Sequence, residues 1–349
     1  MSPPTSLYKT LFLSLPNTRR FNSIPSSPTT QTLQDSIRTA IETKNFHQIL
    51  HLLSSSKCPK PPHKIPENPF SFLSSFPQPL QTQIIDEILQ SFIPLRPRSL
   101  PFPAYSLLLS YTLQKSPISL PLSLAVLQST LRSGCPPALQ TRLSLSVAWL
   151  DCRRSGHRKS VAQILSEVRA IGYSPDRTTC NYLLSSLCAV DELAEAVAIL
   201  RDMRGAGCEP DSESYGAVIA AACEARRTDA AAELVREMVA ELRLTPRQGT
   251  VVRIVAAMRA NREVLRAAEM VEFLEREGCG VGFQSHEMVV EGCLERKEFV
   301  AAGKAVMEMA GRGFIPYIHV RQKVVEGLTV IGERDLASAV RRKLAELSS

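Results

Sequence analysis

Apolar residues between positions 142 and 317 form two short runs in every repeat of about 35 residues, with helical rather than alternating spacing. The clearest copy, residues 177–211, reads RTTCNYLLSSLCAVDELAEAVAILRDMRGAGCEPD. Its second run has a stripe at i, i+3, i+4 and i+7, formed by Ala196, Ile199, Leu200 and Met203. This pattern predicts two short antiparallel helices, over residues 178–189 and 192–206.

The same stripe returns in the neighbouring copies, so we expect it to form the buried face of the second helix in each. The equivalent positions are Val161, Ile164, Leu165, Val168; Ala231, Leu234, Val235, Met238; Ala267, Met270, Val271, Leu274; and Ala302, Ala305, Val306, Met309.

Glycines and prolines mark the end of each copy. Four glycines stand 35, 71 and 35 residues apart, at Gly172, Gly207, Gly278 and Gly313. Such glycines suit left-handed helix ends, and the prolines that follow prevent the helix from continuing. The spacing of 71 fits one copy of 36 residues in which we expect Leu242 to take the glycine's place.

A single helical pair cannot bury both of its apolar faces, so each copy needs its neighbours. The pattern therefore predicts an all-α solenoid of antiparallel helix pairs. Such a stack forms one elongated domain with a continuous core, and needs no division into globular domains.

Residues 177–211 resemble a pentatricopeptide repeat. The matching residues are Cys180-Asn181-Tyr182-Leu183-Leu184, Leu187-Cys188, Ala196, Met203, Gly207 and Pro210-Asp211. The Trp, Leu-Gly and Tyr signature of the similar tetratricopeptide repeat is missing. The resemblance implies a P-type protein of plant organelles, folded as a right-handed superhelix. It assigns repeats to residues 102–138, 142–176, 177–211, 212–247, 248–282, 283–317 and 318–347.

Three regions follow from this assignment: 1–31, 32–101 and 102–349. The first has no acidic residue and contains Lys9, Arg19 and Arg20 among many Ser, Thr and Pro, a composition typical of an organelle transit peptide. A disordered basic tail is the alternative. We expect import into the mitochondrion, with the chloroplast as the alternative. The middle region reads as helices separated by proline-rich breaks, and no apolar run reaches the 18 residues of a membrane span.

The net charge of +7 and the pI near 9.0 are compatible with a nucleic-acid partner. Basic residues gather where the two helices of a repeat meet, and their recurrence predicts an edge that contacts phosphates. Solvated turns are the alternative explanation. The residues are Arg153, Arg154, Arg158, Lys159, Arg226, Arg227, Arg259, Arg262, Arg296 and Lys297.

By the resemblance, the fifth and last residues of a repeat together contact one RNA base. The pairs carried over are Ser146 with Asp176, and Asn181 with Asp211. The family's pairing implies guanine for the first pair and uracil for the second, with Thr178 flanking a base.

The later repeats depart from this pattern, since their pairs are Gly216 with Arg247, Val252 with Gly282, and Glu287 with Tyr317. Few consecutive bases are therefore specified. This favours a second hypothesis, in which the solenoid is a scaffold for proteins or for a ribonucleoprotein such as the mitochondrial ribosome.

The sequence offers little for catalysis. Its nine cysteines contain no Cys-x-x-Cys pair, and no phosphate-binding Gly-x-x-x-x-Gly-Lys loop is present. We therefore expect no catalytic residue, no metal and no cofactor. The sequence predicts a non-catalytic protein that binds single-stranded organellar RNA and acts in its processing, stability or translation, alone or with RNA-processing or ribosomal proteins.

Overall fold

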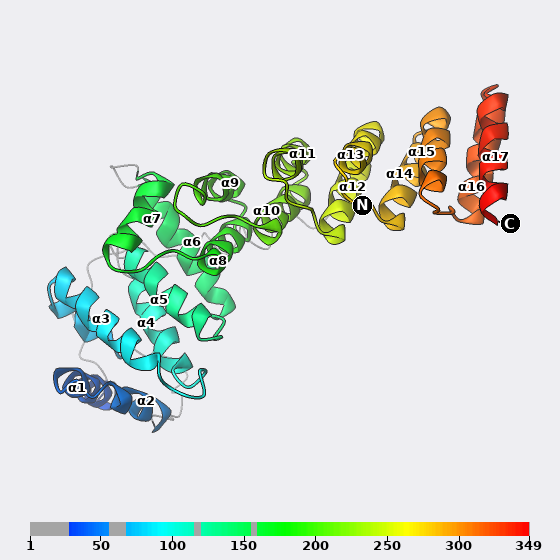
Figure 1. Ribbon diagram of the computed structural model, residues 1–349. Helices are drawn as coiled ribbons and strands as arrows, with labels where there is room; N and C mark the ends of the chain where they lie inside the picture. Colours follow the sequence, from blue (N-terminus) through cyan, green and yellow to red (C-terminus); the bar gives the residue numbers. More distant parts are fainter. Residues whose placement is uncertain (1–27, 56–67, 115–119, 155–158, 349) are drawn as a thin grey trace. The chain divides into compact units, whose positions relative to one another are not determined.

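The computed structural model describes residues 28–55, 68–114, 120–154 and 159–348. The predicted transit peptide, up to residue 27, and Arg158 of the predicted basic edge lie outside these ranges. The described residues form helices α1 to α17 and two short helical segments, without a strand (Figure 1). The chain divides into two compact units between Ser91 and Phe92, about ten residues before the predicted start of the solenoid.

Unit 1 consists of short helices around a small apolar core. Its elements are α1 (Pro28–Glu42), α2 (Phe46–Ser55), η2 (Ser71–Ser75) and most of α3 (Gln78–Phe92). Its fully buried side chains are Ile37, Ile49, Phe70, Leu73, Ile85 and Ile88. Within this unit the amide of Gln34 donates a 3.0 Å hydrogen bond to the hydroxyl of Ser71, which ties η2 to α1.

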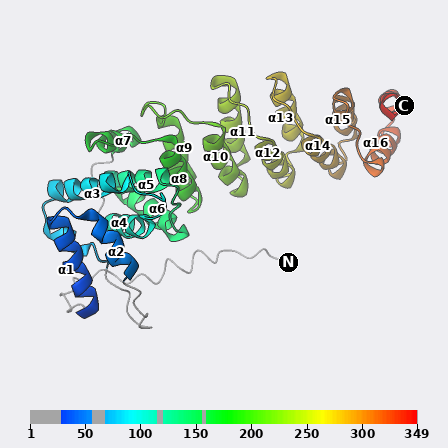
Figure 2. The same ribbon diagram turned by 60° about the horizontal axis from the view of Figure 1, so that its bottom comes forward.

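Unit 2 is a run of helix pairs, which follow one another in chain order (Figures 1 and 2). The first helices of the pairs are α4 (Phe102–Gln114), α6 (Leu139–Arg154), α8 (Arg177–Cys188), α10 (Ser212–Glu224), α12 (Gln248–Ala260), α14 (Phe283–Glu295) and α16 (Ile318–Val330). The second helices are α5 (Leu120–Arg132), α7 (Val161–Ala170), α9 (Leu193–Asp202), α11 (Thr228–Arg236), α13 (Val264–Arg276), α15 (Phe299–Gly311) and α17 (Arg334–Ser348). The predicted all-α fold of stacked helix pairs is confirmed.

The predicted stripes form the core of unit 2. All four residues of the stripe on α9, from Ala196 to Met203, are fully buried, and the equivalent residues of α7, α11, α13 and α15 are buried as well. Trp149 of α6 is also fully buried. Burying a large apolar side chain contributes about 1.5–3 kcal/mol, so the recurring stripes supply the main force that holds successive pairs together.

Left-handed residues end most helices of unit 2 in Schellman motifs. At the end of one repeat, Gly207 has φ 68°, and the amide of Cys208 donates to the carbonyl of Met203. Inside several pairs a basic residue makes the same turn: Arg226, Arg262 and Lys297 have φ values of 55°, 64° and 60°. Between α8 and α9 it is made by Asp191, with φ 60°. These residues therefore have a backbone role in the turn between the helices of a pair.

The prediction for Leu242 is wrong by one residue. The left-handed residue of this repeat is Arg243, with φ 55°, whereas Leu242 has φ −98°. The extra residue of the 36-residue repeat lies just before it, in the π-helical turn η4 (Glu237–Glu241). Here the closing bond runs from the amide of Leu244 to the carbonyl of Met238, one residue wider than in the other repeats.

The packing around α7 differs from that of the later pairs. From α9 onward, each second helix packs against the first helix of the next pair, whereas α5 packs against both α7 and α8. The amide of Gln128 on α5 donates to the carbonyl of Ser174, and Arg132 bonds to Asp176 at 2.8 Å. No helix within the described ranges is long and apolar enough to cross a membrane.

Candidate nucleic-acid interface

Asn181 and Asp211 lie on either side of the hydroxyl of Ser214. Asp211 is the N-cap of α10 and accepts hydrogen bonds from the amides of Glu213 and Ser214, at 3.0 and 2.9 Å. The hydroxyl of Ser214 lies 2.6 Å from Oδ1 of Asn181 and 3.0 Å from Oδ1 of Asp211. It also accepts from the amide of Asp211, which completes a capping box. Helix capping thus fixes the last residue of one predicted repeat beside its fifth residue.

The surroundings of Asp211 keep its carboxylate charged. Burial disfavours the charged form, but the hydrogen bonds from Ser214 and Glu213 and the nearby Arg177 outweigh it, so the pKa of Asp211 is lowered. The guanidinium of Arg177 is 3.5 Å from the carboxylate. Asn181 and Asp211 are both partly exposed, so a fixed amide and a negative charge face solvent together.

The structure does not bring Ser146 to such a position. Ser146 is fully buried, and its hydroxyl donates to the carbonyl of Arg142 at 2.9 Å, one turn earlier on α6. Its predicted partner Asp176 caps α8 instead, where it accepts from the amide and hydroxyl of Thr179 and from Arg132. Burial opposes the charge of Asp176, but these bonds outweigh it and lower its pKa. The predicted pair of Ser146 and Asp176 therefore offers no exposed serine hydroxyl, whereas Thr178 is exposed.

An aromatic cluster that was not predicted from the sequence lies at the boundary of the last two repeats. Tyr317 is 59% exposed, and its ring lies parallel to that of His319 at 6.1 Å and edge-on to Phe283 at 5.5 Å. Glu287, in contrast, is buried and accepts a 3.4 Å hydrogen bond from the amide of Tyr317. Burial raises the pKa of Glu287, against the smaller effect of that bond. The sequence feature that could have predicted this cluster is the placement of its aromatic residues. Phe283 and Tyr317 are the first and last residues of one repeat, and His319 is the second residue of the next.

Four residues of the predicted basic edge are paired with carboxylates. Arg153 and Arg154 contact Glu195 and Glu192 of the next pair, at 2.9 and 3.3 Å. Of the other two residues, Lys159 contacts Glu167, and Arg259 contacts both Glu291 and Glu295. Similar bridges between successive pairs occur elsewhere, for example from Arg201 to Glu233 and Glu237. These ion pairs neutralise much of the predicted edge, and all but that of Lys159 with Glu167 join neighbouring repeats.

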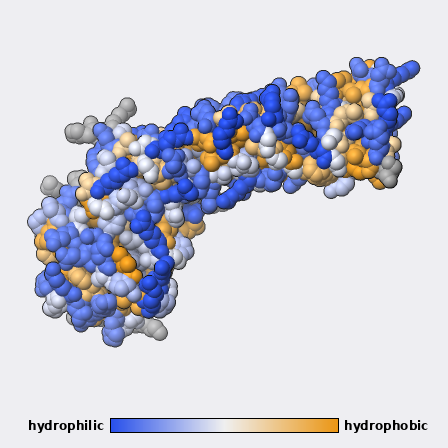
Figure 3. Space-filling view, viewed as in Figure 1, coloured by the Kyte–Doolittle hydropathy of each residue, from blue (hydrophilic) through white to orange (hydrophobic). Residues whose placement is uncertain are grey.

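The remaining residues of the edge, Arg226, Arg227, Arg262, Arg296 and Lys297, are exposed, and none has an ion pair in the described part of the chain. They lie in the turns that follow the first helices, whereas Asn181 lies near the start of such a helix. Ten residues of helix span about 15 Å, so these turns and the capping site lie at opposite ends of the first helices. The face of the molecule in Figure 3 is largely hydrophilic, with apolar residues scattered along unit 2.

Comparison with known proteins finds pentatricopeptide sequences. Residues 175–224 match the model of the PPR repeat family, and residues 213–241 match that of the PPR repeat. The chain is 54% identical over 329 residues to the pentatricopeptide repeat-containing protein At1g06270 of Arabidopsis thaliana, which covers 94% of this chain and 93% of the relative.

Two solved structures are less similar to this chain than the Arabidopsis relative is. The maize pentatricopeptide repeat protein PPR10 aligns with a TM-score of 0.43 and 18% identity over 91% of this chain, which spans 44% of the maize chain. The PPR domain of Arabidopsis thaliana protein-only RNase P 1, solved in complex with tRNA, aligns with a TM-score of 0.36 and 13% identity. That alignment covers 50% of this chain and 91% of the domain.

Proposed function

The chain belongs to the pentatricopeptide repeat family, and from this premise we propose that unit 2 binds single-stranded RNA without catalysing a reaction. The observation that carries the proposal is the partly exposed pair of Asn181 and Asp211, held by Ser214. Base contact by repeat proteins of this kind uses two or three side chains per base. A fixed amide beside a fixed carboxylate meets that requirement.

Asn181 is suited to contact the edge of one base. Its Oδ1 accepts from Ser214, which leaves the NH₂ group, without a partner among the described residues, to donate to a carbonyl oxygen of a base. Asp211 carries a negative charge beside it and can orient the contact directly or through water. The family's pairing assigns uracil to this combination.

Stacking at the aromatic cluster adds a contact without base preference. Tyr317 is exposed and lies parallel to His319, so a base can extend this stack. Stacking on an aromatic side chain is worth about 1–3 kcal/mol per base, whichever base it is. This contact replaces the hydrogen bonds that the buried Glu287 does not offer.

The exposed turn residues are proposed to supply the electrostatic part of binding. Arg226, Arg262 and Lys297 recur in successive pairs and carry no carboxylate partner in the described structure. Phosphate contacts of this kind weaken as salt rises. We expect the affinity for RNA to fall with salt accordingly.

The cellular role is proposed from composition. The acid-free, Ser- and Arg-containing N-terminal segment supports import into an organelle, with the mitochondrion as our first choice and the chloroplast as the alternative. There the protein would act in RNA processing, stability or translation. A single Asn/Asp pair contributes only about 1–3 kcal/mol of discrimination, so selection of one transcript requires further contacts.

A scaffold for proteins or for a ribonucleoprotein is the second candidate function. It is favoured by the residues at the base-contacting positions of the later repeats. Gly216 and Val252 have no polar side-chain atoms, and Glu287 is 5% exposed.

The test uses the full-length chain and a randomised single-stranded RNA library, with Asn181→Thr as the variant and Asn261→Thr as the control. We expect Asn181→Thr to shift one position from uracil toward guanine, and the control to leave the profile unchanged. An unchanged profile for Asn181→Thr contradicts the base contact. No salt-dependent RNA binding by the unmodified chain contradicts the function and favours the scaffold.

A further inference from the structure

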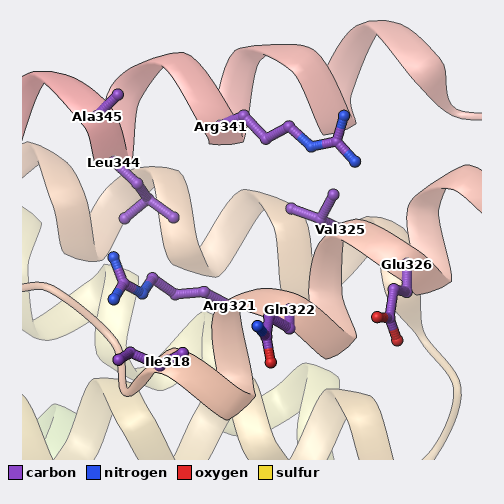
Figure 4. A pocket seen from close by; sticks show the side chains of 8 residues that line it. All are labelled: Ile318, Arg321, Gln322, Val325, Glu326, Arg341, Leu344 and Ala345. Atoms are coloured by element: carbon purple, nitrogen blue, oxygen red, sulfur yellow. The ribbon is translucent and has the colours of Figure 1, made fainter.

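The last helix pair contains an open groove of about 460 Å³ between α16 and α17 (Figure 4). Ile318, Val325 and Leu344 form apolar parts of its wall, and Arg321 and Arg341 enter it from the two helices. Ile318 is 64% exposed. Neither arginine has an ion pair in the described part of the chain. The groove therefore combines apolar walls with two unpaired positive charges.

The two arginines occupy positions that are buried in the other repeats. The counterparts of Arg321 are Leu145, Cys180, Tyr215, Val251 and His286, and those of Arg341 are Leu165, Leu200, Val235, Val271 and Val306. Each of these ten residues is at most 2% exposed, because the next pair covers it. In the last pair, charged side chains therefore occupy positions at which the other repeats have mostly apolar side chains in contact with the next pair.

The repeat architecture defines what fits such a groove. At successive junctions the first helix of one pair packs on both helices of the pair before it: α10 on α8 and α9, α12 on α10 and α11, α14 on α12 and α13, and α16 on α14 and α15. By analogy with these junctions, the groove between α16 and α17 can accept one helix. At the junction of α12 and α14, carboxylates of the incoming helix pair with an arginine, since Glu291 and Glu295 contact Arg259.

We propose that this groove binds an amphipathic helix of a partner protein, with carboxylates on the helix facing Arg321 and Arg341. An arginine covered by a partner without an acceptor would be a buried, unpaired charge, which is strongly unfavourable. The occupant must therefore supply carboxylates as well as an apolar side chain that covers Ile318, since Val325 and Leu344 are already buried. The acidic side chain of Glu326, which also lines the groove, and the apolar walls favour a helix over the phosphates of RNA.

The inference extends beyond RNA binding, since it gives the chain a second surface. With RNA bound along the repeats and a protein helix at the last pair, one molecule would bring a partner to its transcript. The two activities use different residues and are separable by mutation.

The experiment places a photo-crosslinking amino acid at Ala345, an exposed residue of the groove, in the full-length chain inside cells that express it. We expect one major partner, crosslinked through a helical peptide with acidic residues on one face. The double variant Arg321→Glu/Arg341→Glu should lower the yield about tenfold, because like charges then face each other. The matched control is Arg342→Glu, next to Arg341 on α17 and outside the groove, and it should leave the yield unchanged.

Reversal of the charges on the partner's helix, from Glu to Arg, should restore crosslinking to the double variant. Circular dichroism melting curves check that all variants fold. A crosslink to RNA, to a second copy of the chain or to a peptide without acidic residues would overturn the proposal, as would no crosslink or a yield insensitive to charge reversal. RNA affinity measured on the same variants tests the proposed function separately, and it should not change.

Discussion

The hydroxyl of Ser214 lies 2.6 Å from Oδ1 of Asn181, across a repeat boundary and 33 residues along the chain. Ser214 belongs to the capping box of α10, so the start of this helix also fixes the orientation of the amide on α8. A change in helix capping should therefore change base preference.

Ser214→Ala should reduce both stability and base preference. It removes the hydroxyl shared by Asn181 and Asp211, and the loss of a hydrogen bond of this kind costs about 1 kcal/mol of unfolding free energy. Urea denaturation measures that loss, and a randomised RNA library measures the preference for uracil. The control is Ser212→Ala on the same helix, α10, which removes a hydroxyl that donates to the carbonyl of Thr245. Equal base profiles for the two variants would contradict the coupling of capping to base contact.

Arg259→Gln and Arg262→Gln should separate structural from RNA-binding charges. Arg259 joins two carboxylates of the next pair, so its loss should lower the unfolding free energy by about 1 kcal/mol. Arg262 is exposed and unpaired among the described residues, so its loss should leave stability unchanged and reduce the salt dependence of RNA binding by about one unit of slope. Thermal melts and RNA titrations at several salt concentrations measure both effects. If the Arg259→Gln variant keeps its stability but binds RNA more weakly, Arg259 contacts phosphates and its assignment to a structural role is wrong.

Glu287→Gln should stabilise the protein at neutral pH. Burial raises the pKa of Glu287, so the charged form is the costly one in the folded state. The protonated side chain of Glu287 contributes to the free energy of unfolding. This contribution is fully present below the pKa of an unfolded glutamate and is lost as pH rises through the raised pKa. The melting temperature of the natural chain should fall over that interval relative to the Gln variant. The exposed Glu333→Gln is the control, and a parallel pH profile for the natural chain and the Glu287→Gln variant would contradict the assignment.

Arg243→Gly and Leu242→Gly should have opposite effects on stability. Arg243 has a left-handed backbone, which costs roughly 1–2 kcal/mol for a residue with a side chain, so glycine should stabilise the chain after loss of the weak exposed pair with Glu277. Leu242 has an ordinary backbone, and glycine there should cost about 1 kcal/mol or more. Urea denaturation compares the two. Stabilisation by Leu242→Gly instead would place the extra residue of this repeat after position 242.

The sequence by itself determined the helix pairs and their buried stripes. Hydrophobic spacing is set by the geometry of one helix, so the stripe of Ala196, Ile199, Leu200 and Met203 could be read without knowledge of its neighbours. The glycine at 207 was equally readable, because a positive φ is a local preference. Both are short-range properties of the chain.

Only the tertiary structure decided which polar side chains meet. Ser146 and Asn181 share a repeat position, yet Ser146 is fully buried with its hydroxyl bonded to the carbonyl of Arg142, whereas Asn181 is partly exposed and lies beside the hydroxyl of Ser214. Likewise, Arg259 is neutralised by carboxylates 32 and 36 residues away, while Arg262 has no such partner among the described residues. Local spacing fixes which face of a helix is apolar, but the partners of a charged or polar side chain depend on how separate helices are placed.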